Sequence, residues 1–218
     1  MGVGDKKSRH LFLFGGSPPF NRKLGRQFAN CSLNGNGKVG MLFIEREGWR
    51  EYMPKYTSIL KEYGLNNFSY IALSQNPSED SIKELRTCAG IIICGGDTVR
   101  YREYIVDTYL NKLIREMYEV GVPLAGFSAG ALIIPEQCVI SPKDNQDNEL
   151  LFRKGLGILK DCVIGVHYSQ WNEEENVRKA ITKTSVSVGY GIDEGAGAYF
   201  HNETLTATEG CISIIERK

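Results

Sequence analysis

The sequence lacks the patterns by which several common classes of protein are recognised. The apolar run nearest the N-terminus, residues 10–14, is five residues long, too short for the core of a signal peptide or for a membrane span. Lys plus Arg and Asp plus Glu both number 26, so the formal net charge is zero and no overall field attracts polyanions. We therefore expect a cytoplasmic protein that binds neither nucleic acid nor membrane.

Metal-ligating and disulfide patterns are also missing. The three histidines, His10, His167 and His201, are scattered, and there is no HExxH motif or paired Cys/His spacing. The six cysteines include no CxxC pair, and Cys94 and Cys162 lie in apolar runs, where a thiol acts as a small hydrophobic side chain. The sequence thus predicts reduced cysteines, no metal site and no cofactor.

What the sequence does contain is a regular alternation of apolar and amphipathic segments. A chain of 218 residues, 42% of them hydrophobic, suits one domain, and we expect residues 1–218 to form it. Continuous apolar runs predict strands covered on both faces, hence a mainly parallel sheet. These runs are 10–14, 39–44, 68–73, 90–96 and 122–128. Helical spacing or capping signals predict helices at 49–63, 78–88 and 98–120. The fold class is therefore α/β, a three-layer sandwich.

The pattern loosens after residue 130. The polar stretch 141–155 has no clear periodicity and is predicted to be a long surface loop that lies over a site. Beyond it, the predicted elements are a buried strand at 161–168, a helix at 172–184 capped by Asn172, and strands at 186–193, 196–201 and 211–216. Residues 173–175, three glutamates, are expected to form a solvated first helical turn.

The stretch GFSAG, residues 126–130, fits G-x-S-x-G, in which a serine occupies a tight turn between a strand and a helix. An apolar strand precedes it and AGALII can begin a helix. Ser128 is then a candidate nucleophile, and the N–H of Ala129 would lie close enough to its hydroxyl to stabilise an oxyanion. The alternative is a tight packing point where a small residue is needed.

A nucleophilic serine needs a base, and His167 is the leading candidate because it ends a predicted strand, where open parallel sheets usually place ligands. His10 precedes the first predicted strand and is expected at the surface. Asp193 and Glu194, between two apolar strands, supply a carboxylate to orient the imidazole, and only one of them can face it. A rival arrangement pairs His201 with Asp161 or Asp193, as in α/β-hydrolases.

A second glycine turn, CGGD at residues 94–97, follows another strand, and the Gly96 N–H could complete an oxyanion pocket with Ala129. Five segments follow one another along the chain: FGGSPPF, GGD, GFSAGA, HYSQ and GIDEG. With these segments in this order, the chain resembles the serine peptidases that include dipeptidase E and cyanophycinase. The resemblance covers most of the chain and implies a fold like that of class I glutamine amidotransferases, which is flavodoxin-like, with serine where those enzymes carry cysteine.

The resemblance also implies roles for individual residues. Ser128 would be the nucleophile, His167 the general base and Glu194 the acid that orients it, with the Gly96 and Ala129 amides as the oxyanion hole. The arginines that family members with an acidic preference carry after the histidine are not clearly present, since SQWNEEENVRKA offers only Arg178 and Lys179. An aspartyl preference is therefore not predicted. Candidate substrate-binding residues are Asp97, Gln170 and Arg178.

The sequence thus predicts a serine-type peptidase acting on small peptides, without metal. Two alternatives stay open. One keeps the three residues but hydrolyses another amide, an isopeptide or an ester, and the other is a ligand-binding protein that has lost catalysis. Aromatic residues at helical spacing on 49–63 and 98–120, including Tyr56 and Tyr101, are expected in the core or at an interface, and an exposed part of such faces would support a homodimer.

Overall fold

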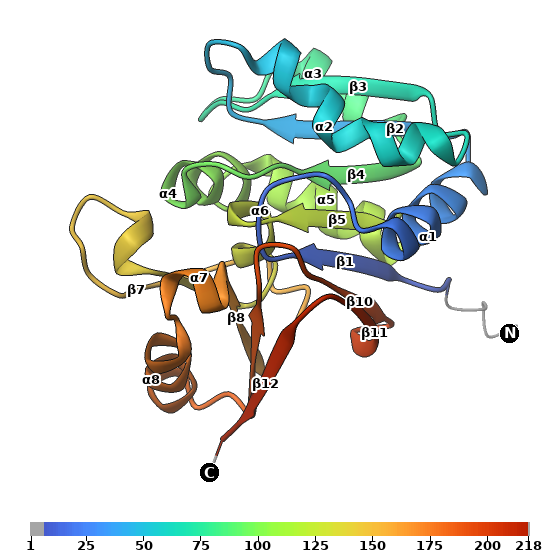
Figure 1. The fold of residues 1–218 in the computed structure, drawn as a ribbon. Helices are drawn as coiled ribbons and strands as arrows, with labels where there is room; N and C mark the ends of the chain where they lie inside the picture. Colours follow the sequence, from blue (N-terminus) through green and yellow to red (C-terminus); the bar gives the residue numbers. More distant parts are fainter. Residues whose placement is uncertain (1–6, 218) are drawn as a thin grey trace, which may run out of the picture.

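A seven-stranded sheet forms the centre of the computed structural model, which describes residues 7–217 (Figure 1). The strand order is β11-β10-β1-β5-β4-β2-β3. The five parallel strands are β1 (His10–Phe14), β5 (Leu124–Phe127), β4 (Gly90–Ile93), β2 (Lys38–Phe43) and β3 (Asn67–Ala72). They overlap the five apolar runs. Most residues of β1, β2, β4 and β5 are buried because helices cover both faces. Strand β3, at the edge of the sheet, has only one buried residue, so the expected coverage on both faces is wrong there.

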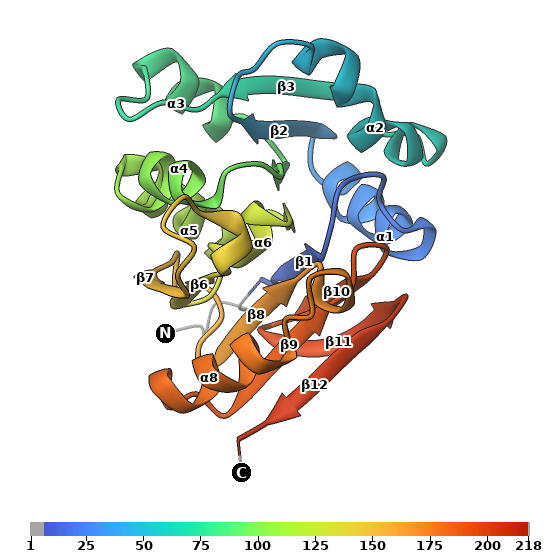
Figure 2. The same ribbon diagram turned by 60° about the vertical axis from the view of Figure 1, so that its left-hand side comes forward.

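Two helices lie on each face of this sheet, which confirms the predicted three-layer α/β sandwich. Helices α1 (Arg22–Leu33) and α2 (Trp49–Glu62) lie on one side, and α3 (Glu79–Arg86) and α5 (Tyr109–Glu119) on the other (Figure 2). The apolar stripe of α2, with Met53, Tyr56 and Leu60, is buried against the sheet, as its helical spacing predicts. Helix α1 was not among the predicted helices.

The C-terminal part of the chain extends the central sheet and adds a smaller one. Strands β10 (Gly197–His201) and β11 (Thr204–Glu209) join the central sheet as antiparallel strands beside β1. Strands β8 (Cys162–Val166), β9 (Val188–Ile192) and β12 (Ile212–Glu216) form the second sheet, on which helix α8 (Glu174–Thr184) packs. The ends of β5, β8 and β9 therefore approach one another where the two sheets meet.

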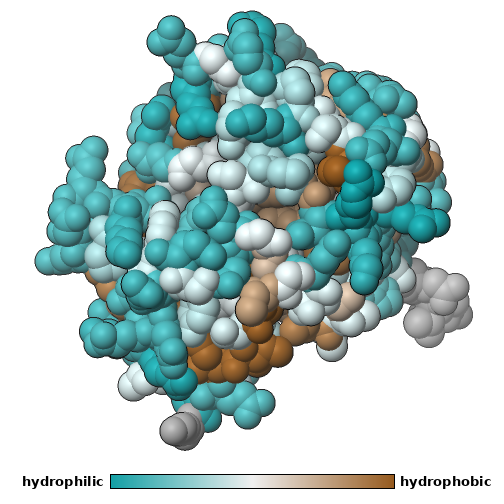
Figure 3. Space-filling model, viewed as in Figure 1, coloured by the Kyte–Doolittle hydropathy of each residue, from teal (hydrophilic) through white to brown (hydrophobic). Residues whose placement is uncertain are grey.

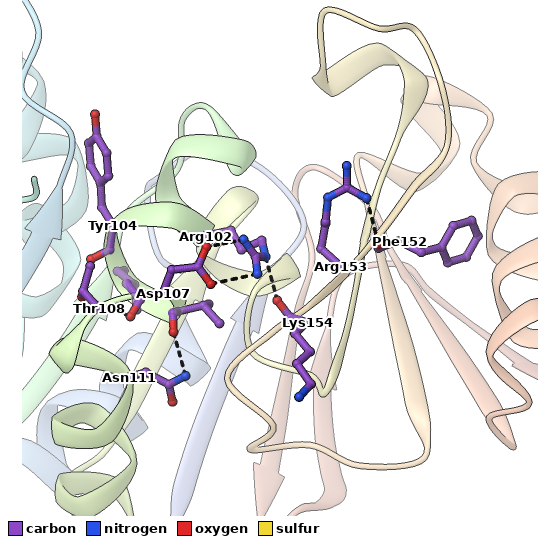
Figure 4. A network of polar contacts seen from close by, with 10 residues as sticks. Arg102, Tyr104, Asp107, Thr108, Asn111, Phe152, Arg153 and Lys154 are labelled. Carbon is purple, nitrogen blue, oxygen red and sulfur yellow. Dashed lines mark hydrogen bonds and ion pairs between the residues drawn. The ribbon is translucent and has the colours of Figure 1, made fainter. Parts of the chain in front are cut away.

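The predicted helix 98–120 is wrong as one continuous element. It consists of α4 (Thr98–Tyr101), a π-helical turn η1 (Arg102–Val106) and α5. Thr108 is extended, and its hydroxyl accepts the Leu110 N–H at 3.2 Å, so α5 starts with its own cap. Figure 4 shows Arg102 closing the π-turn, with two hydrogen bonds to Asp107 and a third to the Lys154 carbonyl at 3.0 Å.

The predicted surface loop 141–155 is also partly wrong. Its first part contains a short 3₁₀ turn, η2 (Pro142–Asp144), and its last part is β7 (Leu151–Lys154), which pairs with β6 (Gln137–Ile140). Strand β11 was likewise not predicted. Its sequence, TLTATE, alternates threonine with other side chains, of which only Leu205 is large and apolar, and most of its residues are exposed, so it contains no continuous apolar run.

The surface seen in Figure 3 is mostly hydrophilic, with an apolar patch near the C-terminal strand β12, where Ile214 is exposed. All six cysteines are free thiols, and Cys94 and Cys162 are buried as expected. Within residues 7–217, no helix combines the length and the apolar character needed to cross a bilayer. Residues 1–6 and 218 of the expected single domain lie outside the described part of the chain.

Candidate active site

Ser128 occupies a tight turn between β5 and the short helix α6 (Ala129–Leu132). Its φ of 48° and ψ of −109° are strained for a residue with a side chain, and such strain is often found at functional sites. The Ser128 N–H donates to the Phe14 carbonyl at 2.9 Å, so the turn is fixed to the end of β1. The structure thus has the strand-to-helix geometry that the G-x-S-x-G pattern predicts.

The two glycines of the motif are required by close backbone packing. A Cβ on Gly126 would lie 2.5 Å from the Gly130 carbonyl oxygen. A Cβ on Gly130 would lie 2.3 Å from the carbonyl oxygen of Ile93, at the end of β4. Since any side chain would push these backbones apart, both positions admit only glycine, and they hold α6 tightly against the ends of β4 and β5.

His167 faces Ser128 from the end of β8. Its Nε2 lies 3.0 Å from Ser128 Oγ, within hydrogen-bond distance. His167 itself has a positive φ of 46° and begins helix α7 (Tyr168–Trp171), while its N–H donates to the Gly15 carbonyl at 2.8 Å. The structure therefore joins two residues that are 39 positions apart in the sequence through the loop that follows β1.

Burial lowers the pKa of His167, and the nearby carboxylates of Glu194 and Glu173 act in the opposite direction. The imidazole is nearly buried, and the ring of Trp171 stacks on it with centroids 4.4 Å apart. A lowered pKa keeps the ring neutral at mildly acidic pH. A neutral imidazole is the form that can accept a proton from the serine hydroxyl.

Glu194, not Asp193, is the carboxylate beside His167. Its Oε2 lies 3.8 Å from His167 Nδ1, which is an ionic contact longer than a hydrogen bond, and its side chain is 54% exposed. Asp193 points elsewhere, because its Oδ1 accepts the Ser169 N–H at 2.9 Å at the start of α7. The two neighbouring acids therefore have different surroundings, as expected, although the reason is that Glu194 lies in the turn after β9.

Gly15 and Gly16 allow the acidic turn to approach the site. A Cβ on Gly15 would lie 2.1 Å from the Ile192 carbonyl oxygen, and one on Gly16 would lie 2.4 Å from Glu194 Cγ. The Gly15 N–H also donates to the Ala196 carbonyl at 3.1 Å. These contacts were not predicted from the sequence. The signal was present, since GG follows β1 in FGGSPPF just as it follows β4 in CGGD.

The amides proposed to bind an oxyanion lie at the ends of β4 and β5. Ala129 is the first residue of α6, where an N–H has no partner inside the helix. The turn that carries Gly96 is held by two buried tyrosines, since Tyr56 OH accepts the Gly95 N–H at 2.9 Å and Tyr101 OH donates to the Gly95 carbonyl at 3.3 Å. Both tyrosines lie in the core, and their hydroxyls fix this turn as well.

The three candidate substrate-binding residues already have partners within the protein. Asp97 caps α4 by accepting the Arg100 N–H at 3.0 Å, and Gln170 Oε1 accepts the Glu194 N–H at 3.0 Å. Arg178 forms hydrogen bonds of 3.0 and 2.8 Å with Glu174 of its own helix. Of these residues, Gln170 belongs most closely to the site, because it supports the turn that carries Glu194.

The histidine of the rival arrangement lies at the other end of the sheet. His201 pairs with His10 across β10 and β1, while Ser128 follows the opposite end of the adjacent strand β5. Asp161 precedes β8, whereas His167 follows it. His10 is the first residue of β1 and is half-buried against Tyr199 OH at 2.7 Å, so the expected surface position was wrong.

The segment 141–145 connects both sides of the site. The Thr98 hydroxyl donates to the Asp144 carboxylate, and Lys143 Nζ donates to the Trp171 carbonyl at 2.8 Å. The Ser141 hydroxyl donates to Glu173 at 2.7 Å. Glu173 is buried, so the expectation of a solvated glutamate turn is wrong for its first residue. Helix α8 accordingly begins at Glu174, and Asn172 ends α7 in the left-handed conformation.

Proteins similar to this chain in sequence include cyanophycinases and a peptidase E. A cyanophycinase from Geminocystis herdmanii is 26% identical over 171 residues, which are 74% of this chain and 63% of that protein. One from Synechococcus elongatus is 28% identical over 74% of this chain and 53% of that protein. A peptidase E from Shewanella denitrificans is 33% identical over 42% of this chain and 39% of that protein. The matches thus span less than two thirds of these relatives.

Solved structures agree on the fold. A peptidase from an acI-B1 actinobacterium has a TM-score of 0.67 and 16% identity, over 97% of this chain and 88% of that one. A proposed peptidase E from Listeria monocytogenes has a TM-score of 0.68 and 21% identity, over 93% of this chain and 98% of that one. The model of peptidase family S51 matches residues 39–208, a range that includes Ser128, His167 and Glu194. The chain therefore belongs to peptidase family S51.

Proposed function

We propose that this chain is a serine-type peptidase that hydrolyses small peptides through Ser128, His167 and Glu194. The observation that carries the proposal is the 3.0 Å contact between Ser128 Oγ and His167 Nε2 at a strained turn between a strand and a helix. Membership of family S51 supports the same reaction class. A serine held only for packing would not need a basic partner in hydrogen-bond contact.

In the proposed reaction, Ser128 Oγ attacks the carbonyl carbon of the scissile amide while His167 Nε2 accepts the hydroxyl proton. The protonated imidazole then gives this proton to the leaving amine as the C–N bond breaks. A water molecule, deprotonated by the same imidazole, attacks the acyl carbon. The ester bond to Ser128 Oγ then breaks, and the imidazolium returns its proton to that oxygen. Glu194 stabilises the imidazolium that forms in both steps, and the contact with Nδ1 shortens as the charge develops.

The negative charge on the carbonyl oxygen is assigned to the N–H groups of Ala129 and Gly96. Ala129 begins α6, so its amide carries the partial positive charge of a helix N-terminus. Tyr56 and Tyr101 support this role by fixing the neighbouring Gly95 from both sides. Amides that are already oriented stabilise the charge without reorganisation during the reaction.

The substrate class follows less directly from the residues. Arg178, the arginine that the sequence offers for a substrate carboxylate, is already paired with Glu174, and we do not propose an acidic preference. Two relatives are named cyanophycinase, so cyanophycin is a second candidate substrate beside small peptides. A cytoplasmic location and a homodimer stay predictions from the sequence.

The experiment is intact-mass labelling with a fluorophosphonate, followed by hydrolysis of a dipeptide library and of cyanophycin. We expect a single adduct on the wild type, which is lost in Ser128→Ala and strongly reduced in His167→Ala. Turnover of dipeptides or of the polymer then decides the substrate. An adduct with turnover only of esters or isopeptides would favour the alternative hydrolase. A folded wild type with neither adduct nor turnover would contradict the mechanism and favour a ligand-binding protein.

A further inference from the structure

We propose that Trp171 is a positioning residue for His167, whose indole ring holds the imidazole in the plane that serves Ser128 and excludes water from its face. The inference rests on the proposed function, because it gives the base of that reaction a second support. The two rings are stacked, with centroids 4.4 Å apart and planes inclined by 23°. Stacking at this centroid distance is a favourable aromatic contact.

The contact follows from the backbone. His167 begins α7 and Trp171 ends it four residues later, and the Trp171 N–H donates to the His167 carbonyl at 2.7 Å. Residues four apart on a helical turn have neighbouring side chains. The short helix therefore brings the indole over the imidazole.

A helix of four residues needs external support to hold this geometry. At its start, the Ser169 N–H is bound by Asp193, and at its end the Trp171 carbonyl accepts Lys143 Nζ at 2.8 Å. The next turn is fixed by Glu173, whose buried carboxylate accepts the Ser141 hydroxyl and the Asn176 amide at 2.7 and 3.1 Å. The backbone of α7 is thus fixed at both ends, and the indole that it carries stacks on the imidazole.

The contact with Glu194 alone orients the imidazole only weakly. Glu194 lies 3.8 Å from Nδ1, beyond hydrogen-bond distance, and its side chain is more than half exposed. The charged groups that face the ring are Glu194 and the more distant Glu173, and both favour the imidazolium. Burial favours the neutral ring and has the largest effect. Because Trp171 covers one face of the ring, it contributes to that burial as well as to orientation.

The test compares Trp171→Phe and Trp171→Ala with the wild type, and Trp49→Ala serves as the matched control because Trp49 stacks near Phe43 and Tyr70, away from the site. The first readout is the NMR titration of the His167 ring protons, which needs no turnover. We expect Trp171→Ala to raise the His167 pKa by about one unit, since desolvation falls while the attraction of both glutamates stays. Trp171→Phe should stay near the wild-type value.

The second readout is the pH profile of kcat and KM on the substrate found in the labelling experiment. We expect kcat of Trp171→Ala to fall about tenfold on the alkaline plateau with KM little changed, and the acidic limb to move to higher pH. Trp171→Phe should restore most of kcat. Lys143→Met, an exposed substitution that frees the Trp171 carbonyl, should move both readouts in the same direction by a smaller amount.

An unchanged His167 pKa and an unchanged kcat in folded Trp171→Ala would overturn the inference, as would a loss in Trp49→Ala of the same size. If Trp171→Ala does not fold, equal pKa and kcat values in Lys143→Met and wild type would overturn it. Failure of the proposed function is seen separately, as absent labelling and turnover in the wild type. In that case the NMR titration still reports whether the indole perturbs the imidazole.

Discussion

The two sides of the candidate site are built in different ways. On one side, Ser128 lies in the turn between β5 and α6, at the ends of the buried parallel strands β4 and β5. The glycines of this turn leave no room for a Cβ. On the other side, Glu194 lies on an exposed turn after β9, 3.8 Å from the imidazole, and is held by Gly16 and Gln170. His167 lies between the two sides, with a hydrogen-bond distance to one and a longer ionic contact to the other.

This difference indicates how precisely each residue has to be placed. The attacking oxygen must lie within a few tenths of an ångström of its reactive position, and backbone packing supplies that precision. In the proposed reaction the acid acts through charge on an imidazole that Trp171 also supports, so a longer and more exposed contact is sufficient. Substitutions on the serine side should therefore damage folding and activity together, whereas those on the acid side should lower activity with little effect on folding.

The largest effect is expected from Gly130→Ala. Its Cβ would lie 2.3 Å from the Ile93 carbonyl oxygen, and that backbone cannot move without disturbing β4. We expect a loss of about 3 kcal/mol or more in unfolding free energy and no labelling of Ser128. Urea denaturation measures the first and intact mass the second. A stable variant that is labelled at the wild-type rate would contradict the role given to packing.

Glu194→Gln comes next. Removing the charge leaves the imidazolium without its partner, so we expect kcat to fall about 100-fold with the urea midpoint nearly unchanged. Asp193→Asn is the matched control, and it should keep most of the activity because the side-chain oxygen can still accept the Ser169 N–H. If Asp193→Asn loses more activity than Glu194→Gln, the assignment of the two acids is wrong.

Gly16→Ala should have an intermediate effect. The new Cβ would lie 2.4 Å from Glu194 Cγ and 2.5 Å from the Glu194 carbonyl oxygen, so the acidic turn must move away. We expect kcat to fall about tenfold, while the fluorophosphonate still reaches Ser128. Gly48→Ala, at the N-cap of α2 with a φ of 72°, strains the backbone at the start of α2 and controls for a loss of stability alone.

The smallest effect is expected from Gln170→Ala. It removes the 3.0 Å hydrogen bond to the Glu194 N–H on an exposed turn, so kcat should fall only a few-fold with KM unchanged. A rise in KM without a change in kcat would instead identify Gln170 as a substrate-binding residue, the role suggested by its position in the sequence.

The comparison of the two sides also explains what could be predicted from the sequence. The serine turn is a local motif, because β5, the glycines and α6 are consecutive, and GFSAG therefore carries most of its geometry. The acidic side depends on Gly15 and Gly16, about 180 positions before Glu194, and no local pattern joins them. The indole of Trp171 was not recognised because α7 is too short to give a helical period.

The same reasoning applies to the fold. Buried parallel strands such as β1 and β2 are continuous apolar runs and were predicted to within one residue at each end. The break between η1 and α5 could not be predicted, since it depends on a cap by Thr108 and on Arg102 binding the distant Lys154 carbonyl. Likewise, β7 exists because β6 pairs with it, although its own sequence, LFRK, has little strand character.

The central claim is that neutral His167 activates Ser128, and the most direct test is the rate of fluorophosphonate labelling as a function of pH. Since burial lowers the pKa of His167, the neutral form is present above that pKa and is lost as the pH falls through it. We predict that the labelling rate rises with pH to a plateau, with a midpoint below 6.5, and that Ser128→Ala abolishes it. A labelling rate on Ser128 whose midpoint lies above 6.5, or a rate that is unchanged in His167→Ala, would contradict the account.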